Sequence, residues 1–251
     1  MNLREIRLIP VYLADEIRPG DDLLQKLVDS LQHQKFVLAN NDVVVIKHKI
    51  ISKAEGQVVP LESVRPRKSA ALWARRYGVD ARVVELALRE AKRVVRQKNG
   101  ALITETSHGF VCANSGVDAS NVDGGKTAVL LPENPDRSAA RLQSRIKKTV
   151  GVSVAIIVSD SFGRPWREGL CEVAIGVAGM KPLLDYRGKR DPHGYQLRAT
   201  AEAVADELAC AAGLVCGKLN RTPICIVRGF RYQPGRESAR DLIRKKNDLF
   251  R

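Results

Sequence analysis

Two polar segments of the chain carry the residue types that metal-assisted phosphoryl transfer needs. The first, residues 108–122, gathers hydroxyl, amide and carboxylate side chains around glycines: Asn114, Ser115, Asp118, Ser120 and Asn121. A hard carboxylate such as that of Asp118 suits Mg²⁺ or Mn²⁺, which keep several water or phosphate ligands. On this loop alone, a turn whose Asn and Asp side chains cap their own backbone is an equally good interpretation.

The second polar segment, residues 158–167, favours the catalytic interpretation. It follows the apolar run 152–158, which predicts a buried strand, so a rigid backbone is expected to hold Asp160 and Ser161 just beyond the strand end. These two are candidate metal ligands, and Arg164 is a candidate clamp for a carboxylate or phosphate. A salt-bridged surface turn is the alternative. Because no nucleophile–histidine pair is evident, the pattern favours metal-assisted phosphoryl chemistry over covalent catalysis.

The elements that must position these residues follow from apolar periodicity. It predicts helices over residues 23–31, 69–77, 138–149, 199–216 and 236–246, and a longer helix from Asp80 through Val95 that Asn99-Gly100 ends. Strands are expected over 42–47, 152–158 and 223–227, with short strands and loops over 101–131. Since strands and helices mix without a regular βαβ rhythm, the predicted fold class is α+β, with mixed sheets and packed helices.

Composition narrows the class of protein. The 251 residues are 44% hydrophobic, which excludes a disordered chain, and no apolar run is long enough to span a membrane. Five cysteines without a C-x-x-C pair support neither a disulfide framework nor a cysteine-rich zinc site. We therefore expect a soluble cytoplasmic protein. The net charge of +14 suits anionic partners, but the basic residues are scattered, which disfavours nucleic-acid binding as the main function.

Several long motifs, in order, resemble one known family. They are IPVYLADEIRPGDDL, HKIISKAEG, VCANSGVDASNV, SDSFGRPWREG, VAIGVAGMKPLLDYRGKRD, ATAEAVADELACAAGLVCGK and ICIVRG. Together they cover nearly the whole chain, residues 9–229, and resemble the coenzyme F420-0:γ-glutamyl ligase family. The resemblance implies a single ligase domain over residues 1–251 with that family's fold. Two intimately associated subdomains are expected without a flexible linker, one of them an insertion at roughly 80–165.

The activity that this resemblance implies is a GTP-dependent amide ligation. In that family GTP phosphorylates a carboxylate of F420-0, and the amine of L-glutamate then attacks the acyl phosphate. Further glutamates are added through γ-linkages. The implied cofactors are GTP as co-substrate, Mg²⁺ or Mn²⁺, and K⁺, and the implied assembly is a homodimer. The basic composition suits a substrate that carries phosphodiester and carboxylate groups.

The resemblance also assigns roles residue by residue. Asp118 and Asp160 match the ligands of the first metal, Ser161 stands at the second metal, and Asn121 matches a nucleotide contact. The nucleotide-binding stretches correspond here to Leu13, Ala14, Asp15, Glu16, His48, Lys49, Lys53, Cys216, Gly217, Lys218, Leu219, Asn220, Arg221, Thr222 and Pro223. The first stretch reads LADE where many members have glycine-leucine-proline.

Lys218 departs from the family pattern, because some members place an oxygen side chain there as a ligand of the second metal. A protonated lysine is no metal ligand. Three interpretations stay open at this point: the second metal is absent, it is bound differently, or Lys218 itself supplies the charge at the phosphates.

Two other functions remain as alternatives. One is a metal-dependent, nucleotide-using enzyme for another acidic substrate, either an ATP-grasp-like ligase or a phosphohydrolase. The other is a basic nucleic-acid-binding protein, for which affinity would fall steeply with salt.

Overall fold

The computed structural model of the chain describes residues 5–120 and 123–244. Its main sheet has five strands in the order β1-β12-β2-β8-β9. The strands are β1 (Arg7–Val11), β2 (Val43–Lys47), β8 (Ala155–Arg164), β9 (Arg167–Ala178) and β12 (Ile224–Arg228). Neighbours β2 and β8 are parallel, and the other pairs are antiparallel. The carboxyl ends of β2 and β8 therefore lie at the same edge of the sheet.

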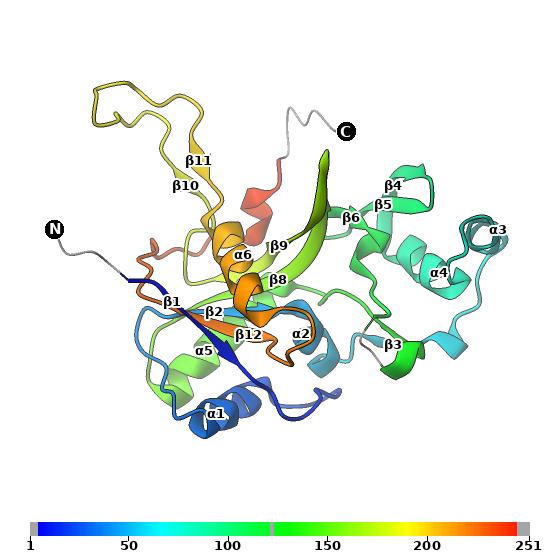
Figure 1. The fold of residues 1–251 in the computed structure, drawn as a ribbon, viewed down its shortest axis with the longest axis horizontal. Coiled ribbons are helices and arrows are strands. Elements are labelled where there is room, and N and C mark those ends of the chain that lie inside the picture. The colour runs from blue at the N-terminus through cyan, green and yellow to red at the C-terminus, as the bar shows by residue number, and fades with distance from the viewer. Residues whose placement is uncertain (1–4, 121–122, 245–251) are drawn as a thin grey trace.

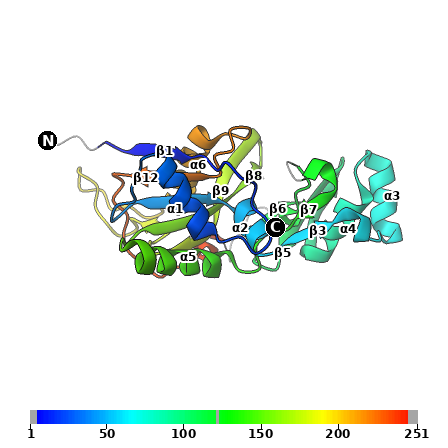
Figure 2. The same ribbon diagram turned by 90° about the horizontal axis from the view of Figure 1, so that it is seen from below.

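Helices cover both faces of this sheet. The apolar sides of α1 (Leu23–His33) and α5 (Pro135–Val150) share a core with Val44 and Ile46. The opposite face, with Val43 and Val45, packs against α6 (Val204–Cys216). Figure 2 shows α5 and α6 on opposite sides of the sheet. Because both faces of β2 are covered, its residues from Val43 to Ile46 are all buried, which explains its uninterrupted apolar run.

Residues between β2 and β8 build a second group of elements beside the main sheet (Figure 1). Strands β3 (Val58–Pro60) and β7 (Thr127–Val129) pair, and β4 (Ala91–Lys98), β5 (Ala101–Thr106) and β6 (Val111–Ala113) form a three-stranded sheet. Helices α3 (Lys68–Tyr77) and α4 (Ala81–Glu90) pack onto them around a core that includes Leu61, Leu102 and Leu130. Helix α2 (His48–Ala54) lies between this group and the main sheet (Figures 1 and 2).

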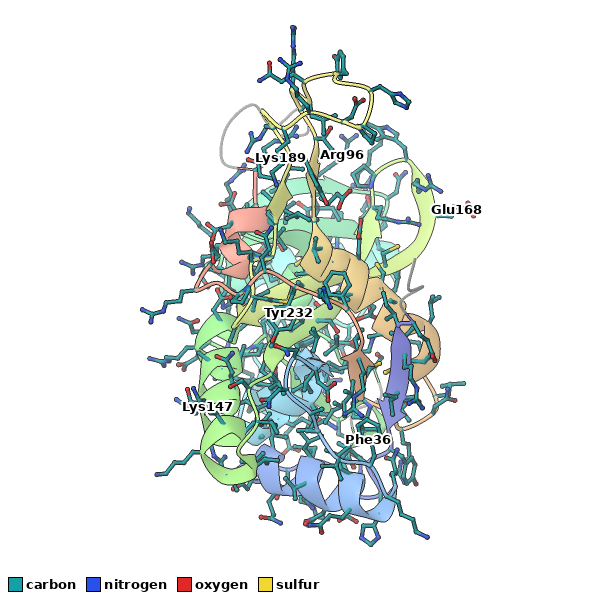
Figure 3. The ribbon with its side chains drawn as sticks, turned by 90° about the vertical axis from the view of Figure 1, so that its left-hand side faces the viewer. Phe36, Arg96, Lys147, Glu168, Lys189 and Tyr232 are labelled. Carbon is teal, nitrogen blue, oxygen red and sulfur yellow. The ribbon has the colours of Figure 1, made fainter. Side chains whose placement is uncertain are left out.

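The remaining elements are short. Strands β10 (Leu184–Asp185) and β11 (Ala201–Glu202) pair at the base of an arm that projects from the main sheet (Figure 1). Single 3₁₀ turns are η1 (Leu61–Ser63), η2 (Asn114–Gly116), η3 (Asp123–Gly125) and η4 (Ala239–Leu242). Figure 3 labels three basic residues from different parts of the chain: Arg96 lies on β4, Lys147 on α5, and Lys189 in the loop between β10 and β11.

The predicted α+β fold with mixed sheets is confirmed. The helices expected at 23–31, 69–77 and 138–149 are present, as are the strands at 42–47 and 223–227, within a few residues of the expected bounds. In the described part of the chain, no helix has both the length and the apolarity that a membrane crossing requires. The division into one domain with an insertion at about 80–165 stays a prediction.

The helix predicted from Asp80 through Val95 is wrong in its second half. Helix α4 ends at Glu90, and β4 follows directly and pairs with β5 in a hairpin. The two residues between the strands, Asn99 and Gly100, have φ angles of 50° and 81°. Positive φ at both central positions is typical of a type I′ hairpin turn, for which Asn-Gly is the preferred sequence. The dipeptide that we interpreted as a helix end is a hairpin turn.

Three further bounds differ from the prediction. Strand β8 begins at Ala155 but runs on to Arg164, so the polar segment at 159–164 lies inside a strand and not beyond it. Helix α6 begins at Val204 rather than near residue 199. The helix expected over 236–246 is the single turn η4 within the described residues.

Gly176 on β9 permits a close approach of α5. A Cβ atom at this position would lie 2.5 Å from the carbonyl carbon and oxygen of Pro135, the first residue of α5. Since backbone would have to move, we expect Gly176→Ala to lower the free energy of unfolding by about 2 kcal/mol, measured by urea denaturation. Gly163→Ala is the matched control, because a Cβ on Gly163 meets nothing within 4 Å. Equal stability of the two variants would contradict this packing.

Candidate active site

An open pocket of about 770 Å³ lies where the parallel pairing of β2 with β8 ends, beside the carboxyl end of β2 and the middle of β8. It is lined by residues 13, 15–17, 47–50, 53, 118, 120, 159–161, 170 and 216–223. These come from the loop after β1, the junction of β2 with α2, the loop before β7, the middle of β8, one residue of β9, and the end of α6 with the loop that follows it. Crevices beyond the carboxyl ends of parallel strands are common ligand sites, because loops of different origin meet there.

Most of the predicted site residues meet in this pocket. Asp118, Asp160 and Ser161 line it, together with the predicted nucleotide-binding residues His48, Lys49, Lys53, Leu13, Asp15, Glu16, Cys216, Gly217, Lys218, Leu219, Asn220, Arg221, Thr222 and Pro223. Chain segments up to 210 residues apart in sequence, from Leu13 to Pro223, are thus brought to one cavity. Their roles in binding and catalysis remain predictions.

Three predicted residues are not placed in the pocket. Ala14 lines a smaller neighbouring pocket of about 360 Å³ beside α1. Arg164 lies at the exposed end of the β8–β9 hairpin, where its Nη2 donates to the carbonyl oxygen of Glu168 at 3.0 Å. The extension of β8 places Arg164 apart from the residues that line the pocket, and its role as an anion clamp stays a prediction. Asn121 lies outside the described residues.

Asp118 forms an ion pair across the pocket wall with Lys49 of α2. Lys49 Nζ lies 2.6 Å from Asp118 Oδ2 and 3.1 Å from the carbonyl oxygen of Ser120, to which it donates. The backbone N–H of Ser120 donates to Asp118 Oδ1 at 2.6 Å. Burial by itself raises the pKa of Asp118, but these hydrogen bonds and the charge of Lys49 outweigh it and lower the pKa below its ordinary value. Asp118 is therefore ionised at neutral pH and able to hold a cation.

Asp160 is paired with a buried histidine. His48, the first residue of α2, places Nε2 3.3 Å from Asp160 Oδ1, and its Nδ1 lies 3.4 Å from Ser52 Oγ. The same Oδ1 accepts a hydrogen bond from the backbone N–H of Ser161 at 2.7 Å. The direct passage from β2 into α2 fixes His48 beside β8, so the Asp160 carboxylate is held in place at the pocket wall.

Two charged residues of this region were not predicted. Lys47, the last residue of β2, places Nζ 2.5 Å from Oε1 of Glu172 on β9. Glu172 is 7% exposed and also accepts hydrogen bonds from Ser159 Oγ at 3.1 Å and from Ser161 Oγ at 2.6 Å. A glutamate inside the apolar run of β9 was the available signal, since a buried carboxylate requires partners.

Two carboxylates that line the pocket are available to a divalent metal ion. Among the described residues, no group of three or more His, Cys, Asp and Glu side chains is arranged to hold one. Mg²⁺ and Mn²⁺ in nucleotide sites need fewer, because one or two carboxylates suffice where phosphates and waters complete the shell. The carboxylates of Asp118 and Asp160, which both line the pocket, fit that requirement. Ser161 does not fit as it stands, since its hydroxyl is engaged by Glu172 and Lys218.

Comparison with known proteins shows where this chain belongs. A family model described as F420-0:gamma-glutamyl ligase matches residues 13–229. A protein of Methanopyrus kandleri named coenzyme F420:L-glutamate ligase is 44% identical over 255 residues, with 99% of both chains covered. Proteins of that name from Methanothermobacter thermautotrophicus and Methanocaldococcus jannaschii are 40% and 43% identical, covering 98% and 86% of this chain and 99% and 87% of theirs.

The chain therefore belongs to the F420-0:γ-glutamyl ligase family. The match from residue 13 to residue 229 includes every segment that lines the pocket. The sequence-based predictions of the family and of a ligase that forms carbon–nitrogen bonds are confirmed.

Proposed function

We propose that the chain joins L-glutamate to coenzyme F420-0 in a GTP-dependent reaction, adds further glutamates through γ-linkages, and proceeds through an acyl phosphate. The observation that carries this proposal is the pocket beside the end of the β2–β8 pairing, which lies wholly within the family match and surrounds two aspartates with cations. The names of the relatives support the two substrates.

The chemistry requires activation of the acceptor, because a free carboxylate would have to expel oxide. In the first step a carboxylate oxygen of F420-0 attacks the γ-phosphorus of GTP, a P–O bond forms, and the bond to the departing GDP oxygen breaks. In the second step the amine of glutamate attacks the acyl carbon, inorganic phosphate leaves, and the nitrogen loses a proton. The products are an amide, GDP and phosphate. Such transfer depends mainly on alignment and charge stabilisation.

The pocket residues have distinct parts in this proposal. Asp118 and Asp160 hold Mg²⁺ or Mn²⁺, which when bound neutralises triphosphate charge and aligns the transfer. Lys49 and Lys53 approach from α2, and Lys218 and Arg221 from the loop after α6, so cations flank the cavity where phosphates are to bind. Lys53 Nζ is 2.7 Å from Glu16 Oε1, and this ion pair holds the ammonium group at the pocket wall.

Three further features are proposed on the family resemblance: K⁺ as an additional activator, a homodimer as the assembly, and a cytoplasmic location. Light scattering after size-exclusion chromatography tests the assembly. A dimer mass is the expected result, and a monomer mass at all protein concentrations would contradict it.

Mass spectrometry tests the reaction itself. Purified protein is incubated with F420-0, L-glutamate and Mn²⁺, with GTP in one tube and ATP in another. We expect additions of glutamyl residues in the GTP tube and far fewer with ATP, and their number gives the chain length. Equal addition with ATP would contradict GTP dependence. GTP hydrolysis without addition would point to another acidic acceptor, and no reaction, with salt-sensitive binding to RNA or DNA, would favour the nucleic-acid alternative.

A further inference from the structure

Polar side chains of three adjacent strands meet in one cluster beneath the pocket. Lys47 of β2 is the register partner of Ser159 on β8, and Ser161 on β8 is the register partner of Glu172 on β9. Neighbouring strands thus place two hydroxyls between a lysine and a glutamate. Lys218, from the loop after α6, completes the cluster with Nζ 3.2 Å from Glu172 Oε1 and a hydrogen bond to Ser161 Oγ.

Lys47 and Lys218 differ in solvent exposure, so only one of them can present its charge to the pocket. The Nζ atom of Lys47 is inaccessible to solvent and lies 2.5 Å from Glu172 Oε1, so its charge is balanced by that carboxylate inside the protein. Lys218 has a side chain that is 58% exposed and lines the pocket. One carboxylate between two ammonium groups leaves a surplus of one positive charge. Because the Lys47 charge is enclosed, that surplus is presented to the pocket by Lys218.

Helix α6 encloses the cluster from above. Gly213 of α6 approaches Glu172 so closely that a Cβ atom there would lie 2.7 Å from Glu172 Cγ, and Cys210 Sγ donates to the carbonyl oxygen of Glu172 at 3.1 Å. Glu172 is therefore fixed by strand pairing on one side and by α6 on the other. It positions Lys218 at the pocket edge without itself lining the cavity.

The same contacts disagree with a metal ion at Ser161. The Ser161 hydroxyl donates to Glu172 Oε1 at 2.6 Å and accepts from the Lys218 ammonium group. Coordination of a divalent ion by this oxygen would require displacing Lys218, and the ion would then meet a Glu172 carboxylate whose charge Lys47 already balances. Lys218 supplies fixed positive charge at a point where phosphate charge has to be neutralised.

We propose that Lys218, positioned by Glu172 and with Lys47 neutralising that glutamate, is a phosphate-binding residue that takes the place of a second divalent metal ion. The chain then binds one divalent ion per active site, at Asp118 and Asp160. This inference rests on the proposed function of the pocket as a triphosphate site, but it does not depend on which nucleotide or which acceptor is used.

Inorganic triphosphate is the probe that tests this inference without relying on the nucleotide base. Calorimetric titration without metal is expected to show binding to the wild type and at least a tenfold weaker affinity in Lys218→Gln, since a hydrogen bond to a charged group is lost. Lys218→Arg keeps the charge and is expected within about threefold of the wild type. Lys148→Gln on α5 removes the same charge away from the pocket and is expected to bind as the wild type does.

Metal stoichiometry is the second measurement. Mn²⁺ is added to a solution in which protein is in excess over triphosphate, and electron paramagnetic resonance measures the free Mn²⁺. We expect binding to saturate at one Mn²⁺ per protein–triphosphate complex. Two bound Mn²⁺ ions, no triphosphate binding by the wild type, or equal affinity in Lys218→Gln and the wild type would each overturn the inference. Failure of glutamate addition in the mass-spectrometric assay, with these binding results intact, would instead remove the proposed reaction.

Discussion

The rate of glutamate ligation is expected to be on the order of a thousandfold lower in Asp118→Asn and in Asp160→Asn than in the wild type, while both variants stay folded. A divalent metal contributes several kcal/mol of charge stabilisation to a phosphoryl-transfer transition state, and each 1.4 kcal/mol corresponds to a factor of ten in rate. Asparagine keeps the size of the side chain and one oxygen but loses the negative charge that holds the ion. Initial rates of glutamate addition at saturating Mn²⁺ measure the effect.

The design separates a lost metal site from a lost fold. Asp118 has a side chain that is 35% exposed, so its replacement leaves the cores of the protein intact. Asp29→Asn is the matched control, because Asp29 lies on α1 and does not line the large pocket. The activity of this variant is expected to match that of the wild type. Circular dichroism verifies folding, and Mn²⁺ binding gives a readout besides turnover. Turnover within a few-fold of the wild type in either variant would remove Asp118 and Asp160 from the metal site.

Residue types in the two polar segments indicated four side chains that line the pocket, those of Asp118, Ser120, Asp160 and Ser161, but also three that do not line it, those of Asn114, Ser115 and Arg164. Aspartates and hydroxyls after an apolar run indicated a site at a strand end, and the resemblance connected distant segments. The pairing of these groups was not predictable, because it depends on which strands are neighbours. Asp118 lies in the loop before β7 and forms a β-bridge with Val129 of that strand. Its ion-pair partner Lys49 lies on α2, 69 residues earlier in the sequence.

The contacts of Glu172 could not be predicted from the sequence for a second reason. It lies opposite Ser161 only because β8 continues past residue 158 and turns back as β9. With the strand predicted to end at 158, the polar segment was interpreted as a loop, and no cross-strand partner was sought for Ser161. The length of β8 also explains the position of Arg164, which lies near the end of the hairpin and not among the pocket-lining residues. Strand length depends on backbone pairing, which apolar patterning alone does not report beyond the buried residues.

At residues 91–98 a helix and a hairpin strand compete for the same segment. Residues 91–98 have apolar positions that fit a helix, but they are mostly exposed in the structure and pair with β5. The turn preference of Asn-Gly and the pairing with 101–106 outweigh a helical periodicity that has little apolar surface to bury.

The contribution of Glu172 to the free energy of unfolding is expected to disappear at acid pH. Burial raises the pKa of this carboxyl, but hydrogen bonds from Lys47 and Ser161 and the charges of Lys47 and Lys218 outweigh it and lower the pKa from 4.5 to about 2. A pKa that is lower in the folded state contributes stability that is fully present above pH 4.5 and is lost as the pH falls toward about 2. The difference corresponds to about 3 kcal/mol in the free energy of unfolding.

Glu172→Gln removes this titration while keeping the side-chain size. At neutral pH we expect it to be about 3 kcal/mol less stable than the wild type, because the buried Lys47 loses its counter-charge. Below pH 4.5 the wild type loses its advantage, so the two urea-unfolding curves converge. Glu168→Gln is the control on the same strand, at an exposed position that Figure 3 shows at the edge of the molecule, and is expected to follow the wild type. A constant difference between Glu172→Gln and the wild type at every pH would mean that Glu172 is not held ionised by this cluster, and Lys218 would then lack the anchor that positions it.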